Sequence, residues 1–148
     1  MANNNKDRYG KDLKIQITSD KDGFQISDLD VSRTGDLGTV QGEATVLQAI
    51  RNRLATRRGE LTELGHPEYG SLLETVIGEP NTEDTRHVIE TLVRDCLHYE
   101  PRIENIIEII ASQNKMDQNI VDINVSLKLR GAREAIRVVY PMYLEETL

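Results

Sequence analysis

Three glutamates in one loop-like stretch are the first residues that could do chemistry. Glu60, Glu63 and Glu68 lie in residues 58–71, which are too rich in glycine and proline to form regular secondary structure. Glycoside hydrolases use two carboxyl groups at a set separation, one of them with a raised pKa. A lysozyme-like, peptidoglycan-degrading enzyme is therefore one hypothesis. Three glutamates in one loop are nevertheless expected in a chain with 25 acidic residues, and no aromatic platform for a sugar accompanies them.

Other nucleophiles and metal ligands are isolated. Cys96, the only cysteine, falls on the apolar face of a predicted helix, which favours a small core residue over a nucleophile. His66, His87 and His98 do not stand at metal-ligand spacing. The phosphate-binding, dinucleotide-binding, GxSxG and CxxC motifs are all missing from the sequence. We therefore predict no catalytic residue, no metal and no cofactor.

The segment Glu100-Pro101-Arg102 joins a helical pattern to a strand pattern. Proline lacks the N–H that a helix needs and disfavours helical geometry at the preceding residue, so a helix should end by Glu100. If the chain continues extended, Glu100 and Arg102 point to the same side. They then form either a surface ion pair, worth at most about 1 kcal/mol, or a pair of docking groups for another chain.

Residues 42–100 are predicted to be the helical part and to hold about three helices, over residues 43–59, 71–77 and 83–99. Asn81 or Thr82 should cap the last of them. The apolar positions that define the first and last helices are Val46, Leu47, Ile50, Leu54, Val88, Ile89, Leu92, Val93, Cys96 and Leu97.

Four arginines crowd the end of the first predicted helix: Arg51, Arg53, Arg57 and Arg58. Cations at this position complement the negative end of a helix. Contact with an acidic partner surface is the alternative explanation.

Alternating apolar residues predict an antiparallel sheet in residues 101–141. Residues 103–110 carry isoleucine on both faces, which is typical of a central, covered strand. Residues 121–129 alternate apolar and polar side chains, as in a strand with one wet face. Residues 134–140 alternate again, and Pro141 should end that strand. The prediction is a three-stranded meander, and the fold class is α+β.

The last of these strands is expected to be the exposed edge of the sheet. It carries Ile136, Val138 and Tyr140 on one side. An edge strand has unpaired N–H and C=O groups, and a strand from another chain can satisfy them. We therefore expect this edge to hold a partner by main-chain hydrogen bonds.

Residues 1–12 are polar and without periodicity, so they predict a flexible arm. Residues 13–41 contain two strand-like patches around the turn signal Asp22-Gly23 and predict a hairpin, followed by a linker from Ser32. Residues 13–148 are expected to form a single α+β domain.

Composition and charge exclude two classes of partner. The net charge of −7 argues against broad binding to nucleic acid. No apolar run reaches the roughly 18 residues of a membrane span, and the first residues do not have the pattern of a signal peptide. We expect synthesis in the cytoplasm and no direct membrane insertion.

The order of these motifs resembles a known family. A helix with Ile50 and Leu54 is followed by Gly59-Glu60, by residues 67–73 and by a helix that closes on residues 100–103, before the strand-rich end. Over about residues 40–141 this order resembles the baseplate wedge and sheath-initiator family. Its members occur in contractile-tailed phages and contractile injection systems, including type VI secretion, and some carry a lysozyme-like name.

The resemblance implies a structural, non-enzymatic role in the baseplate of a tail-like particle. In the family, the Glu-Pro-Arg segment packs with other wedge proteins, which here points to Glu100, Pro101 and Arg102. The strand-rich end is similar to a domain of the tail sheath protein and accepts strands from the first sheath ring, which points to the strand with Ile136, Val138 and Tyr140. The implied partners are wedge proteins, the sheath protein and the central hub, spike or inner tube.

The loop marked by Gly59, Glu60, Tyr69 and Gly70 departs from the family pattern. Many members have an arginine directly after the Gly-Glu pair, whereas this chain has Leu61 and a longer loop. The contacts of this loop therefore stay open.

Overall fold

The computed structural model describes residues 11–13, 15–19, 25–29 and 39–144, with side chains from residue 42 onwards. Within it the chain divides into two compact units, residues 1–49 and 50–148. Each unit is considered by itself, and the single-domain organisation of residues 13–148 stays a prediction. Most of the expected arm lies outside the described residues.

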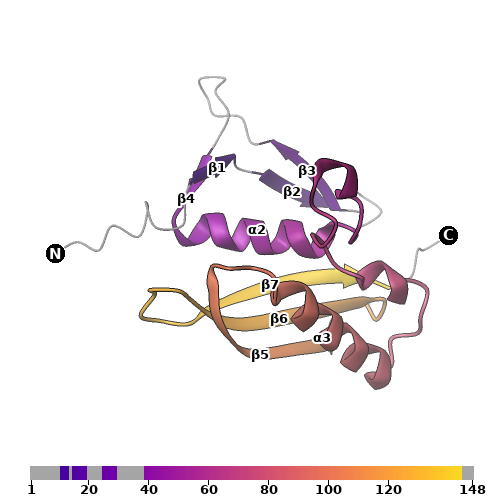
Figure 1. The fold of residues 1–148 in the computed structure, drawn as a ribbon. Coiled ribbons are helices and arrows are strands. Elements are labelled where there is room, and N and C mark those ends of the chain that lie inside the picture. Colours follow the sequence, from indigo (N-terminus) through magenta and orange to yellow (C-terminus); the bar gives the residue numbers. More distant parts are fainter. Residues whose placement is uncertain (1–10, 14, 20–24, 30–38, 145–148) are drawn as a thin grey trace. The chain divides into compact units, whose positions relative to one another are not determined.

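The first unit contains two antiparallel strand pairs (Figure 1). Strand β2 (Ile15–Ser19) pairs with β3 (Gln25–Leu29), in the positions expected of a hairpin. Its expected turn, Asp22-Gly23, lies outside the described residues. Strand β1 (Lys11–Leu13) pairs with β4 (Thr39–Gln41), a pairing that sequence patterns did not predict because both strands are short.

Helix α2 (Glu43–Ala55) crosses the boundary between the units. Its predicted apolar positions Val46, Ile50 and Leu54 are buried. The predicted end at Gly59 is wrong, since the helix ends four residues earlier. After Ala55 the backbone turns to other partners instead: Ser71 N donates to Thr56 O, and Arg58 N donates to Ser71 O, at 2.8 and 2.9 Å.

The described residues contain two α-helices rather than about three, which corrects the prediction. The segment expected to form the short helix is a 3₁₀ helix, Leu73–Val76, and another 3₁₀ helix lies at Thr62–Leu64. Ser71, the first residue of the predicted short helix, does not cap it in the usual way. Its hydroxyl instead donates to Leu54 O at 2.7 Å and accepts only a long hydrogen bond, of 3.4 Å, from Leu73 N.

Helix α3 (Glu83–Leu97) begins at the predicted cap, where Thr82 Oγ1 accepts a hydrogen bond from Thr85 N at 3.2 Å. Its buried face is formed by Ile89, Val93, Cys96 and Leu97. Val88, which the sequence pattern also places on the apolar face, is exposed. The apolar face is therefore centred one position later than the sequence pattern suggested.

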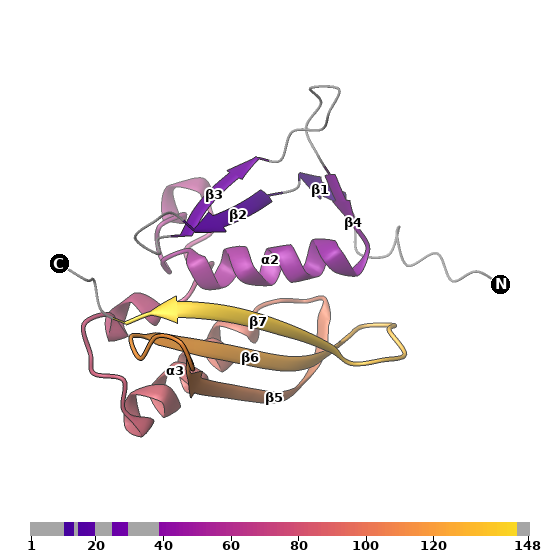
Figure 2. The same ribbon diagram turned by 180° about the vertical axis from the view of Figure 1, so that it is seen from behind.

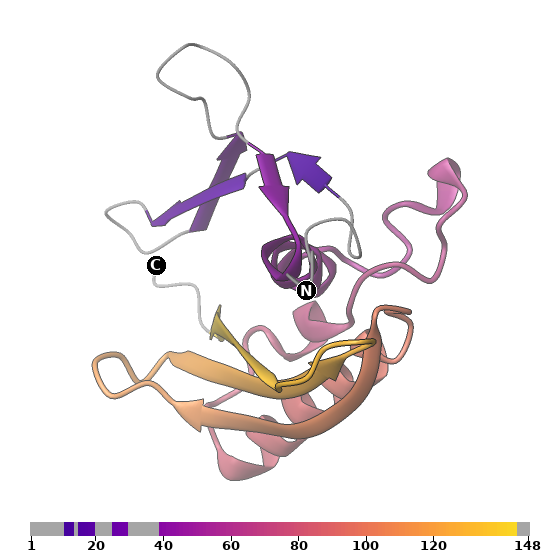
Figure 3. The same cartoon turned by 90° about the vertical axis from the view of Figure 1, so that its left-hand side faces the viewer.

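The second unit contains a three-stranded antiparallel sheet in the order β5-β6-β7, as predicted. The strands are β5 (Ile103–Gln113), β6 (Ile120–Leu129) and β7 (Ile136–Tyr143), and α3 packs along β5 (Figures 1 and 2). Figure 3 shows the twist of the sheet. The expectation that residues 103–110 form the central strand is wrong, because β6 lies in the middle. Ile107 and Ile110 on the edge strand are accordingly exposed.

Strand β7 continues through Pro141, which was expected to end it. In an antiparallel pair, successive residues turn their N–H and C=O groups alternately toward the partner strand and away from it. Leu144 N donates to Asn119 O at 2.9 Å, in register with the β6–β7 ladder, so the even-numbered residues of β7 face β6. Pro141 faces outward, where its missing N–H costs no ladder hydrogen bond.

Candidate docking site

Glu100 is a buried acid at the turn between α3 and β5. It is only 3% exposed. Its backbone closes the turn, because Glu100 N donates to Leu97 O at 3.1 Å and Ile103 N donates to Glu100 O at 3.2 Å. A buried carboxylate needs charged or hydrogen-bonding partners. The sequence-based alternative of an ordinary surface ion pair therefore does not describe this acid.

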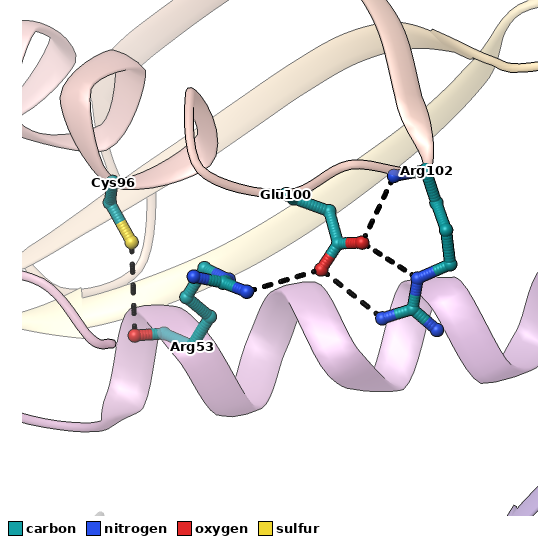
Figure 4. A network of polar contacts seen from close by, with 4 residues as sticks. All are labelled: Arg53, Cys96, Glu100 and Arg102. Atoms are coloured by element: carbon teal, nitrogen blue, oxygen red, sulfur yellow. Dashed lines mark hydrogen bonds and ion pairs between the residues drawn. The ribbon is translucent and has the colours of Figure 1, made fainter. Parts of the chain in front are cut away.

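Arg102 supplies most of these partners (Figure 4). Its Nε donates to Glu100 Oε1 at 2.6 Å and its Nη2 donates to Oε2 at 3.1 Å. The backbone N–H of Arg102 also donates to Oε1, at 3.2 Å. The planar guanidinium thus holds the carboxylate at two points, which fixes the orientation of both groups.

Arg53 of α2 is the second cation at this carboxylate (Figure 4). Its Nη2 lies 3.4 Å from Glu100 Oε2. Its Cζ stands 4.5 Å from the centre of the Tyr69 ring, a cation–π distance. Arg53 therefore links Tyr69 in the predicted loop to Glu100 in the predicted docking segment, two groups that are 31 positions apart in the sequence.

The charges around Glu100 determine its ionisation. Burial by itself would raise the pKa of this carboxyl. Hydrogen bonds from the Arg102 side chain and backbone oppose burial, together with the charges of Arg102 and Arg53, and the net effect is a pKa below the ordinary value. Glu100 is thus held as a carboxylate inside the protein.

The turn itself presents an outer surface. Tyr99 and Pro101 are exposed, and the Arg102 side chain is 32% exposed. Arg130 braces the turn from the β6–β7 connection, because its Nε donates to Pro101 O at 2.8 Å and its N–H donates to Arg102 O at 2.9 Å. The turn of residues 99–102, which we call the Glu-Pro-Arg turn, is therefore rigid and partly accessible.

The loop residues named from the sequence divide into two groups. Gly70 and Tyr69 lie against the second unit's interior, where a Cβ on Gly70 would stand 2.5 Å from Thr56 O. Gly59 and Glu60 are exposed, and Glu60 Oε2 accepts a hydrogen bond from Arg57 N at 3.2 Å. The structure thus brings Tyr69, but not Glu60, to the Glu-Pro-Arg turn through Arg53.

The second candidate surface is the outer edge of β7. Val138 is fully buried, while Ile136 and Tyr140 are half-buried, and the backbone groups of all three face β6. The backbone groups that face outward belong to Arg137, Val139, Pro141 and Tyr143. The use of this edge for docking stays a prediction. The backbone groups available to a partner strand belong to the odd-numbered residues, and not to Ile136, Val138 and Tyr140.

Comparison with known proteins places the chain in a family. The model of the contractile injection system sheath initiator family matches residues 11–130. The chain belongs to this family. Comparison with curated proteins gives no match. Among solved structures, the chain is similar to a protein from Geobacter sulfurreducens, provisionally named a tail lysozyme, with 27% sequence identity and a TM-score of 0.62. The match covers 72% of this chain and 94% of that chain.

Membership in the sheath initiator family assigns this chain a structural role at the baseplate of a contractile system. The hydrolase hypothesis rests on Glu60, Glu63 and Glu68, and all three are exposed. The general acid of a glycoside hydrolase is typically held in an apolar pocket. The loop of this sheath initiator offers none of its three glutamates such a pocket.

The remaining chemical candidates lie apart from one another. Cys96 is fully buried, its Sγ donates to Arg53 O at 3.8 Å, and burial raises its thiol pKa to about 11. His66, His87 and His98 are exposed. Within the described part of the chain, no three His, Cys, Asp or Glu side chains are grouped as metal ligands, and no helix is long and apolar enough to cross a membrane.

Sequence reasoning missed the role of Arg53 in this sheath initiator. The sequence pattern attributes the four arginines at the end of the first predicted helix to the helix dipole or to an acidic partner. Three of them instead pair with carboxylates of the same chain: Arg53 with Glu100, Arg57 with Glu74, and Arg58 with Asp95. The available signal was the apolar helix face, since Arg53 lies three residues after buried Ile50 and is itself largely buried.

Proposed function

We propose that this sheath initiator joins the baseplate through its Glu-Pro-Arg turn and starts the sheath by accepting a strand at the β7 edge. The turn would dock with other wedge proteins, with the central hub, spike or inner tube as further neighbours. The β7 edge would receive an extended segment of the tail sheath protein. The observation that carries the docking part is the buried Glu100 carboxylate, which holds the partly exposed Arg102 guanidinium in one orientation.

A fixed guanidinium at the surface suits recognition. A free arginine side chain loses considerable rotamer entropy when it binds, whereas one held by a buried carboxylate has already lost it. Exposed Tyr99 and Pro101 add rigid apolar area beside Arg102. Aromatic and arginine side chains are the residues most often found at the energetic centre of interfaces. The turn therefore supports docking by a preformed patch rather than by a flexible tail.

Capture of baseplate proteins from the producing cell by tagged variants tests this part. Arg102→Ala should lose the wedge proteins, whereas Lys115→Ala, just beyond the opposite end of β5, should retain them. Because Arg102→Ala should also weaken the fold, Arg53→Ala is the matched variant. It removes the other cation from Glu100 at a side chain only 12% exposed. At a temperature where both variants are folded, equal capture by the two would contradict a direct contact of Arg102.

Strand addition is supported by the direction of the β7 backbone groups. Arg137 and Val139 turn their N–H and C=O groups away from β6, and Val139 is 45% exposed. Pro141 follows on the same side and cannot donate, so a partner strand would pair mainly over residues 136–140. Main-chain hydrogen bonds of this kind hold strands that add to a sheet edge.

A proline at residue 139 tests strand addition. Val139→Pro removes an outward donor and leaves the β6 ladder intact, so the chain should fold but fail to start sheath polymerisation. Val139→Ala keeps the N–H and should still start it. Val138→Pro is unsuitable for this test, because Val138 is buried and faces β6. Normal sheath polymerisation on folded Val139→Pro would refute strand addition at β7.

A further inference from the structure

The two edges of the sheet differ in how they are covered. Asn114 N donates to Ile120 O at 2.9 Å, in register with the β5–β6 ladder, so the odd-numbered residues from 109 to 113 turn their backbone groups away from β6. One of these outward groups is occupied: Ala111 N donates to Oε1 of Glu90, a residue of α3, at 2.9 Å. Among the described residues of β7, no side chain caps an outward N–H in this way.

The position of Glu90 decides its effect. Ala111 lies between Ile109 and Gln113, which carry the neighbouring outward groups of β5. A strand that paired with either neighbour would run past Ala111 and would have to displace the Glu90 carboxylate. A hydrogen bond from a backbone N–H to a carboxylate is stronger than a neutral one, so displacement is costly. Glu90 thus obstructs the middle of the regular stretch of this edge.

The rest of β5 is irregular. Its pairing with β6 shifts register between Ile103 and Asn105 and again between Ile106 and Glu108. β-Bulges bend and twist an edge strand and discourage further pairing. The straight part of the edge, residues 108–113, is therefore the part that needs a cap, and Glu90 caps it at Ala111, near its middle.

We propose that Glu90 closes the β5 edge, so that the sheet of this sheath initiator can be extended only at β7 and accepts one strand per chain. This inference rests on strand addition at β7 as proposed above. An open β5 edge would allow a second strand, or the β5 edge of another copy, to pair there. When the β5 edge is closed, a sheath strand can add to this sheet only at β7, so the sheath grows from one edge of the sheet.

Self-association of the full chain tests the closure. Glu90→Ala removes the cap, and Glu90→Gln removes the same charge but keeps an acceptor oxygen. Sedimentation over a concentration series should show Glu90→Ala associating more tightly than the wild type by roughly ten-fold. Glu90→Gln should fall between the two, because it keeps the cap but with a neutral acceptor. Hydrogen exchange should place the new contact at the amides of Ile109, Ala111 and Gln113.

Folded Glu90→Ala that sediments as the wild type would overturn the proposal. If Glu90→Ala does not fold, amide hydrogen exchange in the wild-type chain tests whether Glu90 caps Ala111. A slowly exchanging Ala111 amide, comparable to the β6-bonded amide of Ile110, supports the cap, and a freely exchanging one refutes it. The Glu90→Ala/Val139→Pro double variant should still associate, because its contact uses β5. The two proposals can therefore fail separately. Normal sheath polymerisation on Val139→Pro would refute strand addition at β7, and wild-type sedimentation of Glu90→Ala would refute closure of the β5 edge.

Discussion

Arg102 and Glu100 form two side-chain hydrogen bonds with each other, 2.6 Å from Nε to Oε1 and 3.1 Å from Nη2 to Oε2, with only Pro101 between them. The carboxylate is buried while the guanidinium reaches the surface. The Glu-Pro-Arg turn is thereby joined to helix α2, since Arg53 of α2 contacts the same carboxylate. Changes at this pair should affect both stability and docking.

The pH dependence of stability should report the Glu100 carboxylate. Its folded-state pKa is lowered below the ordinary 4.5, so the unfolded chain takes up the proton first as the pH falls. The stabilisation is therefore fully present above pH 4.5 and is lost as the pH falls through the folded pKa. Urea unfolding of the wild type followed by circular dichroism should show this loss.

Glu100→Gln is the control for that titration. At neutral pH it should be less stable than the wild type by about 3 kcal/mol, because a buried charge network is broken. The difference should shrink as the pH falls below 4.5. A gap between wild type and Glu100→Gln that stays constant down to acid pH would assign the titration to other carboxyl groups.

Removing Arg102 alone should cost more than removing both charges. Arg102→Gln leaves a buried carboxylate with Arg53 as its only cation, at 3.4 Å, and should lower the free energy of unfolding by about 3 kcal/mol. Glu100→Gln/Arg102→Gln leaves no uncompensated charge of this pair and should be more stable than Arg102→Gln. A double-mutant cycle measures the difference, and strictly additive effects would show that the two side chains are not coupled.

Local patterns predicted the parts of the fold that depend on neighbouring residues. The alternation in residues 121–129 produced β6, whose alternate side chains are buried, and Thr82 caps α3 as its side-chain chemistry predicts. Pro101 keeps Glu100 out of the helix as predicted, although α3 ends at Leu97, two residues before the predicted end at residue 99. The Glu-Pro-Arg turn could be found from sequence for the same reason.

The parts that could not be predicted depend on distant contacts. The isoleucines of β5 suggested a central strand, but strand order is set by connections, and Ile107 and Ile110 are exposed at the edge. Whether Pro141 ends β7 depends on which side its nitrogen faces, and only the pairing register determines that. Arg53 meets Glu100 across 47 positions, and no local pattern encodes such a contact.

Gly70 should be the least replaceable glycine of the loop. Its φ is +107°, and a Cβ would meet the backbone of Thr56 and Arg57 at 2.5 to 2.9 Å. Gly65 is the matched control, with φ of +83° and no atom within 4 Å of its Cβ position. Thermal or urea unfolding should give a loss of about 1 kcal/mol for Gly65→Ala and about 3 kcal/mol for Gly70→Ala. Equal losses would show that the close approach of Gly70 to the α2 end relaxes freely.

Cys96 should be unreactive in the folded chain. It is fully buried, and burial raises its thiol pKa to about 11, so little of the reactive thiolate exists at neutral pH. A thiol-specific reagent should modify it at the rate at which the protein opens, and urea should increase that rate steeply. Because the Cys96 thiol donates to the Arg53 carbonyl, variants that loosen the Glu100 network should react faster than the wild type. Rapid labelling of the folded wild type, at the rate of a free cysteine, would contradict the buried position of this thiol.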